Sequence, residues 1–286
     1  MYRIVKKQEL NPTVTLMSIE APMVARKALA GQFIILRVNE DGERIPLTIA
    51  GYDRKAGTVD IIFQVVGATT EKLNHKQQGE YIQDFVGPLG VASHLEGLKK
   101  VCVVGGGVGN AIAYPIVKAL HEQGSDVTAI LGFRSKDLVI LEDEFRAASN
   151  NFIICTDDGS YGEKGFTTVY LKQEIENNIK EGKPQFDRVI AIGPDIMMKF
   201  LADVTRPYGI STIISLDPIM VDGTGMCGGC RVIVGGETKF ACVDGPDFDA
   251  HQVDFDSLIK RAAFYKDEQD AAAQHICNMT GGKRNG

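Results

Sequence analysis

Residues 100–110 read KVCVVGGGVGN, an apolar run that passes directly into a cluster of glycines. The run lacks the polar alternation of a half-exposed strand, as is typical of strands buried in a parallel sheet. Glycines after such a strand let the backbone approach a pyrophosphate, whose charge is favoured at the N-terminus of the next helix. The stretch therefore predicts the strand, loop and helix of an α/β nucleotide-binding fold. Its candidate binding residues are Gly105, Gly106, Gly107, Val108, Gly109 and Asn110.

Two features separate this stretch from the common dinucleotide-binding pattern. Asn110 occupies the place of the third glycine in G-x-G-x-x-G, and no acid ends the next apolar run, 127–133, where a ribose-binding acid is expected. Arg134 follows that run and suits a 2′-phosphate, although an arginine after a strand is more often simply solvated. A tight turn without a ligand is the alternative, and the choice between NAD and NADP stays open.

The rest of the chain divides into three segments. Between residues 98 and 218 apolar runs alternate with helical stretches, which predicts a parallel sheet joined by helices. Residues 1–97 contain short β-type runs separated by turn pairs, with one helix expected after Gly67, and this pattern is typical of a small antiparallel barrel. Residues 219–286 contain a cysteine segment and a helix expected near 257–276. The fold class expected is therefore α/β plus an antiparallel β-barrel.

The composition excludes several classes of protein. Of 286 residues, 44% are hydrophobic and 24% charged, and no run approaches the roughly 18 apolar residues of a membrane helix. The N-terminus lacks the apolar segment of a secretory signal, so we expect a cytoplasmic protein. The formal charge of −6 argues against nucleic acid as a partner. Six cysteines indicate thiols or metal ligands; Cys102 and Cys155 suit buried positions, and Cys277 has no evident partner.

The cysteine segment carries the most specific pattern. Residues 221–230 read VDGTGMCGGC, which places Cys227 and Cys230 on one glycine loop. The residues that follow read as a hairpin that turns at a glycine pair and returns Cys242 toward the loop. Asp222 is the nearest candidate for a fourth ligand, and the set suits either zinc or a [2Fe–2S] cluster. A disulfide between the first two cysteines, and an ordinary turn-capping role for the aspartate, are the alternatives.

Two stretches of the barrel suit a phosphate or a flavin. In the strand RIPLT, alternation places the arginine, proline and threonine on one face and the apolar residues on the other. After residue 66, a glycine and two threonines open a helix, where hydroxyls and free N–H groups form an anion site; a plain helix cap explains them equally well. The candidates are Arg44, Pro46, Leu47 and Thr48 in the strand and Gly67, Thr69 and Thr70 at the helix start.

The order of barrel, nucleotide fold and cysteine segment resembles the ferredoxin–NADP reductase superfamily over nearly the whole chain. Within it, the chain is similar to the electron-transfer subunits of dihydroorotate dehydrogenase B and to the small subunits of NADH-dependent reduced ferredoxin:NADP oxidoreductase, also described as sulfide dehydrogenase subunits. The dihydroorotate relatives have a cysteine five residues before the C-x-x-C pair. Asp222 stands there in this sequence, as an aspartate does in the ferredoxin:NADP small subunits, which also resemble it in VDGTGMCGGC and FACVDGPDFDAH.

The resemblance implies FAD in the barrel, NAD(H) or NADP(H) in the nucleotide domain and a [2Fe–2S] cluster in the C-terminal segment. It places Thr48 beside the flavin, but Arg44 stands one position further from Thr48 than in the family's flavin motif. The implied pyrophosphate site of the flavin is Gly67, Thr69 and Thr70. The implied nicotinamide nucleotide site is Gly105 to Asn110, Asp157, Asp158, Gly159, Gly193, Pro194 and Met197. The implied cluster ligands are Asp222, Cys227, Cys230 and Cys242.

The resemblance further implies that electrons pass between NAD(H), FAD and the cluster, to or from a larger flavin and iron–sulfur subunit in a heterodimer. Ferredoxin is then an indirect partner, in flavin-based transhydrogenation or bifurcation. No catalytic side chain is expected, because the cofactors carry the chemistry. The alternatives are the electron-transfer subunit of dihydroorotate dehydrogenase B, an electron shuttle without turnover of its own, and a zinc-stabilised nucleotide-binding protein.

Overall fold

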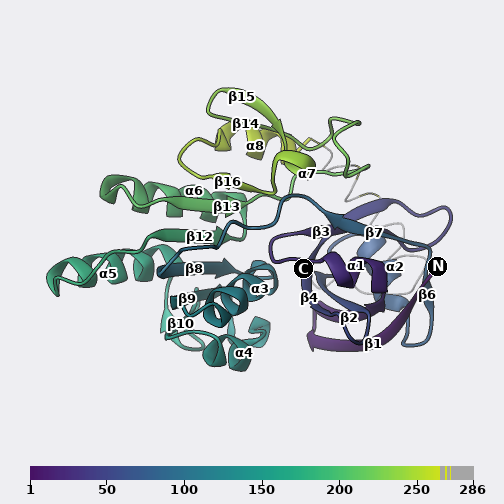
Figure 1. Cartoon of the computed structure of the whole chain (residues 1–286), viewed down its shortest axis with the longest axis horizontal. Helices are drawn as coiled ribbons and strands as arrows, with labels where there is room; N and C mark the ends of the chain where they lie inside the picture. The colour runs from purple at the N-terminus through teal and green to yellow at the C-terminus, as the bar shows by residue number, and fades with distance from the viewer. Residues whose placement is uncertain (265–267, 269–270, 272–286) are drawn as a thin grey trace.

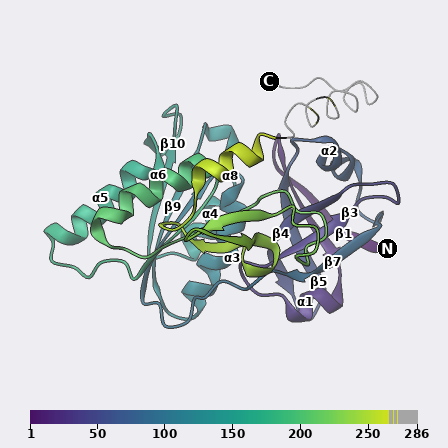
Figure 2. The same cartoon turned by 90° about the horizontal axis from the view of Figure 1, so that it is seen from above.

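A computed structural model describes residues 1–264 together with 268 and 271. An antiparallel sheet forms one end of the molecule, a parallel sheet flanked by helices forms the other, and the cysteine segment lies over both (Figure 1 and Figure 2). The fold class expected from the sequence is confirmed. Cys277 and most of the second half of the expected C-terminal helix lie outside the described residues.

Short strands with one buried face build the barrel sheet. They are β1 (Tyr2–Asn11), β2 (Val14–Glu20), β3 (Phe33–Arg37), β4 (Arg44–Asp53), β5 (Thr58–Gln64), β6 (Tyr81–Ile82) and β7 (Asp84–Leu89), in the antiparallel order β6-β1-β2-β5-β4-β3-β7. On β4, Ile45, Leu47 and Ile49 pack on the barrel core, as the alternation predicted. Two helices occur here, α1 (Pro22–Lys27) and α2 (Ala68–His75), so the expectation of one was wrong: α1 is too short to show helical periodicity.

Continuous apolar runs form the second sheet. Its strands are β8 (Lys100–Gly106), β9 (Asp126–Phe133), β10 (Asn151–Thr156), β11 (Glu163–Lys164), β12 (Arg188–Ile192), β13 (Thr212–Ser215) and β16 (Asp247–Asp249), in the order β11-β10-β9-β8-β12-β13-β16. All pairs are parallel except that of β13 with β16. Nearly all of β8 is buried, which explains why its sequence lacks polar alternation.

Helices cover both faces of this parallel sheet. They are α3 (Gly109–Glu122), α4 (Glu142–Ala147), α5 (Thr167–Lys180) and α6 (Asp195–Thr205), with 3₁₀ turns at Lys136–Leu138 and Arg206–Tyr208. One core contains residues of α3 and α4, and the other contains residues of α5 and α6. Ala111 of α3 shares its core with Ala50 of β4, so the helix that follows the glycine loop also packs against the barrel.

The cysteine segment is attached to both halves of the molecule. Its hairpin, β14 (Arg231–Val234) and β15 (Glu237–Phe240), turns at two glycines as predicted, and α7 (Ala241–Asp244) and α8 (Phe255–Ala262) follow. Beyond the hairpin, β16 extends the parallel sheet. On the barrel side, a Cβ built on Gly223 would lie 2.8 Å from a methyl carbon of Leu89 and 3.1 Å from the Ile35 side chain.

Candidate functional site

The glycine loop after β8 lies where two strands end and backbone segments approach closely. A Cβ on Gly106 would lie 2.4 Å from the sulfur of Met197, and one on Gly109 would lie 2.5 Å from the carbonyl oxygen of Ile192. A Cβ on Gly193 would lie 3.2 Å from the Gly106 backbone. Two predicted stretches of the nucleotide site, the glycine loop and residues 193–197, are thus brought together at the carboxyl ends of β8 and β12, where open α/β sheets bind ligands.

Asn110 explains why the loop departs from the common pattern. Its side chain is buried, and its amide donates to the carbonyl oxygens of Gly107 at 2.9 Å and Gly132 at 3.3 Å. The asparagine thereby fastens the loop to the end of β9, which a glycine at this position could not do. Gly105 leaves the room for it, because a Cβ there would lie 2.0 Å from Asn110 Oδ1.

Asp157 and Asp158 lie beside Arg134 at the same edge of the sheet. The amide of Asp157 donates to the carbonyl of Phe133 at 3.0 Å, and the amide of Asp158 donates to that of Arg134 at 3.3 Å. Burial raises the pKa of Asp157, and the charge of Arg134 acts in the opposite direction. No acid ends β9, but two acids follow β10 at the same edge of the sheet, near Arg134.

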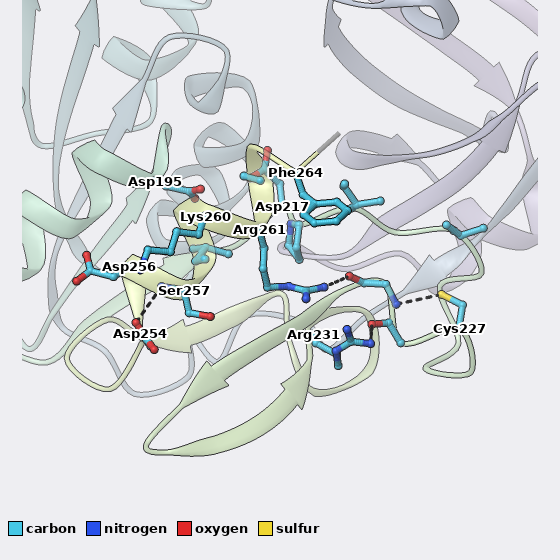
Figure 3. Close-up of a pocket in the computed structure, with 17 residues that line it drawn as sticks. Asp195, Asp217, Cys227, Arg231, Asp254, Asp256, Ser257, Lys260, Arg261 and Phe264 are labelled. Carbon is cyan, nitrogen blue, oxygen red and sulfur yellow. Dashed lines mark hydrogen bonds between the residues drawn. The ribbon is translucent and has the colours of Figure 1, made fainter. Parts of the chain in front are cut away.

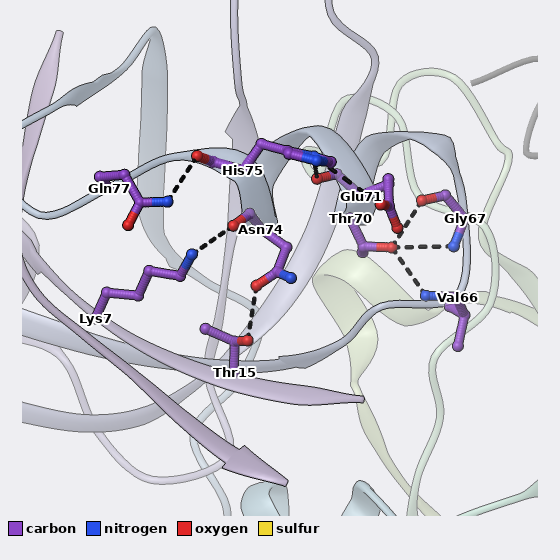
Figure 4. Close-up of polar contacts among 9 residues, drawn as sticks. All are labelled: Lys7, Thr15, Val66, Gly67, Thr70, Glu71, Asn74, His75 and Gln77. Atoms are coloured by element: carbon purple, nitrogen blue, oxygen red, sulfur yellow. Dashed lines mark hydrogen bonds and ion pairs between the residues drawn. The ribbon is translucent and has the colours of Figure 1, made fainter. Parts of the chain in front are cut away.

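The two predicted flavin stretches meet near the start of β4. Thr69 donates a hydrogen bond of 2.8 Å to the carboxylate of Glu43, the residue before Arg44. The hydroxyl of Thr70 accepts two backbone N–H groups, one of them from Gly67 at 3.0 Å, and donates to the Gly67 carbonyl (Figure 4). Both hydroxyls therefore have protein partners, and Thr70 performs the helix-capping role that the sequence offered as an alternative.

Residues of β4 line the adjacent barrel wall. Pro46 and Thr48 are half-buried, opposite residues of β3, and Leu47 points to the barrel core. Arg44 is exposed at the start of the strand and pairs in register with Arg37. The Arg37 guanidinium lies 2.7 Å from Asp84, so its charge is already matched. The exposed Arg44 supplies a cation beside the helix start of α2.

The hairpin brings two cysteines into contact. The carbonyl of Cys230 accepts the N–H of Ala241 at 3.1 Å, which places the Sγ atoms of Cys230 and Cys242 3.2 Å apart. Burial, followed by the hydrogen bond with Cys230, raises the pKa of Cys242 to about 12. A close pair of buried cysteine sulfurs suits a metal ion, because a coordinated thiol is deprotonated by the charge of the metal.

Asp222 and Cys227 form the exposed side of the same loop. The Asp222 carboxylate accepts the backbone N–H groups of Thr224 at 3.0 Å, Met226 at 2.9 Å and Cys227 at 2.8 Å. These bonds, that of Thr224 first, lower the pKa of Asp222 to about 2. The aspartate therefore caps the loop, which was the alternative to a ligand role. A carboxylate offers about four acceptor positions, so the three N–H bonds leave one, which the side chain of Cys227 also reaches.

The four predicted ligands form two pairs, Cys230 with Cys242 and Asp222 with Cys227. Within the described part of the chain, no three His, Cys, Asp or Glu side chains converge closely enough to hold one metal ion. A structural zinc ion takes four ligands at one point, whereas a [2Fe–2S] cluster spreads its protein ligands over two irons. The arrangement of the donors therefore fits an iron–sulfur cluster better than zinc.

A pocket of about 1150 Å³ lies between the CGGC loop, the start of α6 and α8 (Figure 3). Its lining includes Arg231 and Arg261 together with Asp195 and Asp217. Burial, and then the charge of Asp217, raises the pKa of Asp195 to about 6. None of these four residues was predicted as a site residue. They come from separate parts of the chain and match no motif, so no signal in the sequence could have grouped them.

Known proteins resemble the chain over almost its full length. A protein of Thermotoga maritima named dihydroorotate dehydrogenase B (NAD(+)) electron transfer subunit homolog is 45% identical, with 97% of this chain and 96% of that protein covered. The electron transfer subunit of dihydroorotate dehydrogenase B from Streptococcus pneumoniae is 34% identical, with 86% and 94% covered. The chain belongs to the family of dihydroorotate dehydrogenase B electron-transfer subunits and their homologues. Residues 217–254 match the iron–sulfur cluster binding domain of dihydroorotate dehydrogenase B.

A solved structure supports the same family. NADH-dependent reduced ferredoxin–NADP oxidoreductase, described for flavin-based electron bifurcation, superposes with a TM-score of 0.88 at 44% identity and covers 96% of this chain and 98% of that chain. The resemblance to the ferredoxin–NADP reductase superfamily is confirmed, and the chain is an electron-transfer subunit of a flavin and iron–sulfur oxidoreductase. FAD and an iron–sulfur cluster are its cofactors. Among residues 1–264, 268 and 271, every helix is too short or too polar to cross a lipid bilayer.

Proposed function

We propose that the chain moves electrons between NAD(H), FAD and a [2Fe–2S] cluster, to or from a larger flavin and iron–sulfur subunit, in flavin-based transhydrogenation among ferredoxin, NADP and NAD. One observation carries the proposal. An aspartate with one acceptor position beyond its three N–H bonds stands beside Cys227 and near the Cys230–Cys242 pair, on a chain that resembles the ferredoxin–NADP oxidoreductase structure throughout. Ferredoxin is an indirect partner in this proposal, and the larger subunit completes a heterodimer.

The protein's residues bind and orient the cofactors and supply no catalytic acid or base. FAD, when bound, links two-electron hydride chemistry to single-electron chemistry. Gly105 to Asn110 and Gly193, Pro194 and Met197 form the cradle for the nicotinamide nucleotide. Arg44, Pro46, Leu47 and Thr48, with Gly67, Thr69 and Thr70, form the flavin site. Asp222, Cys227, Cys230 and Cys242 would hold the cluster, which supplies single-electron transfer.

The edge at Asp157 favours NAD(H) over NADP(H). A carboxylate accepts a hydrogen bond from a ribose 2′-hydroxyl and repels a 2′-phosphate. Asp157 and Asp158 both lie there with Gly159, and Arg134 faces Asp157 and is offset by its charge. We therefore assign NADH as the preferred nucleotide. The ratio of the rates at which NADH and NADPH reduce the flavin, measured by anaerobic stopped-flow mixing, tests this directly.

The electron-transfer subunit of dihydroorotate dehydrogenase B is the second candidate. The match of residues 217–254 and the Streptococcus relative favour it. The two candidates share cofactors and differ in the partner subunit. We rank the ferredoxin-linked function first because Asp222 stands where the dihydroorotate relatives have a cysteine.

Anaerobic purification of the chain with its native partner tests both candidates. We expect this chain, separated anaerobically from its partner, to carry about one FAD, two irons and two acid-labile sulfides, because its sequence offers each type of site once. We expect NADH to bleach the flavin band and the larger subunit to react with NADP(H) and ferredoxin. A partner that oxidises dihydroorotate would select the second candidate. Zinc in place of iron, or a flavin that neither nicotinamide nucleotide reduces, would refute both.

A further inference from the structure

Two arginines hold the two glycines that separate Cys227 from Cys230. Arg231 Nη1 donates to the carbonyl oxygen of Gly228 at 2.9 Å, and Arg261 Nη2 donates to that of Gly229 at 3.2 Å (Figure 3). Both arginines line the pocket behind the CGGC loop. Successive carbonyls of one short loop are therefore each held by a guanidinium group from the pocket side.

These contacts control the direction of the amide groups on the other side of the loop. The carbonyl of Gly228 and the N–H of Gly229 belong to one planar, trans peptide, so they point in opposite directions. The Gly229 N–H points at the Sγ of Cys227, 3.4 Å away. Holding the carbonyl in the pocket thus keeps the N–H on the sulfur. A charged donor on the carbonyl also polarises that N–H and strengthens its bond.

Arg261 reaches the loop from a helix whose position is fixed independently. Phe255 and Leu258 of α8 are buried in the same core as Cys230 and Cys242. The side chain of Asp254 accepts the N–H of Ser257 at 3.0 Å and caps the start of the helix. Arg261 lies in the last turn, where a positive charge is favoured by the helix dipole. Packing and capping therefore deliver this guanidinium to the loop.

We propose that Arg231 and Arg261 are positioning residues for the cluster: by holding the Gly228 and Gly229 carbonyls in the pocket, they fix the loop with the Gly229 N–H directed at the Cys227 sulfur and raise the cluster's reduction potential. The inference rests on the proposed cluster site. Hydrogen bonds to the sulfurs and nearby positive charge both stabilise the reduced cluster, which carries one more negative charge than the oxidised cluster. Removing either arginine lowers the potential.

The main test is a potentiometric titration of the assembled heterodimer, followed by electron paramagnetic resonance. The variants are Arg231→Met, Arg261→Met, Arg231→Lys and the control Lys260→Met. Lys260 lines the same pocket on the same helix, so the control removes the same charge without touching the loop. We expect both Arg→Met variants to shift the potential downward and change the signal. We expect Arg231→Lys to recover part of the shift and Lys260→Met to leave both quantities near wild type.

Two outcomes would overturn the inference. An unchanged potential in both Arg→Met variants would show that the arginines do not act on the cluster. An equal downward shift in Lys260→Met would show that general charge, and not the contact with the loop, sets the potential. If Arg231→Met loses its iron, the potential of Arg261→Met becomes the deciding measurement. That variant keeps the bond between Arg231 and the Gly228 carbonyl, and so keeps the peptide between Gly228 and Gly229 in place.

A second readout needs no cluster and separates this inference from the proposed function. In the cluster-free chain the Gly229 N–H still lies 3.4 Å from the Sγ of the exposed Cys227. We expect Arg231→Met to speed hydrogen exchange at the Gly229 amide, because the peptide that carries it is no longer held, and Lys260→Met to leave that rate unchanged. A wild-type chain that binds no iron would refute the proposed function, whereas an unchanged exchange rate in Arg231→Met would refute the role of Arg231.

Discussion

Replacing Asp222 by asparagine separates the two roles of this residue. The carboxylate accepts one N–H at Oδ1, from Thr224, and two at Oδ2, from Met226 and Cys227. An asparagine oriented with its oxygen at the Oδ2 position keeps two of these bonds. Its NH₂ group then occupies the Oδ1 position, where the free acceptor for iron would be. The substitution therefore preserves most of the loop cap and removes the proposed ligand.

The size of the capping effect follows from these bonds. Each part-exposed hydrogen bond contributes roughly 0.5 kcal/mol, at the low end of the usual range. Asp222→Ala loses all three, so local opening of the loop should become easier by about 1.5 kcal/mol. Asp222→Asn loses one and should cost about 0.5 kcal/mol. Because the folded pKa is lowered to about 2 from 3.8, the contribution is present above pH 3.8 and is lost as the pH falls toward 2.

Hydrogen exchange and spectroscopy measure the two roles separately. In the cluster-free chain, the amides of Met226 and Cys227 should exchange faster in Asp222→Ala than in Asp222→Asn, whereas that of Thr224 should exchange faster than wild type in both. In the loaded heterodimer, Asp222→Asn should lose iron nearly as completely as Asp222→Ala. Asp222→Cys should keep a [2Fe–2S] cluster with a changed potential and resonance signal, because ligand type helps to set the potential. A wild-type signal and potential in Asp222→Asn would refute the ligand role and leave only the cap.

Three further predictions concern the other sites. Gly109→Ala places a Cβ 2.5 Å from the Ile192 carbonyl, so chemical denaturation should show a loss of roughly 1–3 kcal/mol and titration should show weaker NADH binding. Thr70→Val removes the cap of α2 and should lower stability by about 1 kcal/mol and FAD retention on gel filtration, whereas Thr70→Ser should retain both. Because the Asp195 pKa is raised from 3.8 to about 6, the folded state binds more protons between these values, and stability falls as the pH rises through them. Asp195→Asn should remove this fall in stability. At pH 7.5 the variant should be more stable than the wild type by roughly 1 kcal/mol, allowing for solvent screening of a part-exposed group. Denaturation midpoints that change equally between pH 5 and pH 7.5 in the wild type and the variant would contradict this prediction.

The features that the sequence predicted correctly depend on local or strongly periodic signals. The apolar run of β8 and the glycines after it fixed the α/β half, and the glycine pair at 235–236 set the hairpin register that carries Cys242 to Cys230. A hairpin register follows from its turn, so contacts across it are predictable. The barrel followed from short strands at regular spacing.

The features that the sequence did not predict are created by tertiary contacts. No strand was expected from the sequence at β16, whose three residues Asp247–Asp249 include two aspartates; they form a strand by pairing with the edge of β13. Asn110 looked like a defect in a glycine motif, but it bonds to the end of the next strand. Arg261 lies 32 residues from the glycine that it holds, and an arginine near a helix end has no sequence signal for such a contact.

The antiparallel strand β16 has a consequence for how the chain can be divided. Residues 98–218 contain the predicted nucleotide-binding domain. The outer edge of β13, within that range, pairs with β16, which lies beyond residue 218. Translation stopped after residue 218 would leave that edge bare, and a bare edge recruits strands from other molecules. The outer edge strand of the nucleotide-binding half is therefore made after the cysteine loop, and we expect a chain truncated at residue 218 to aggregate more readily than the full chain.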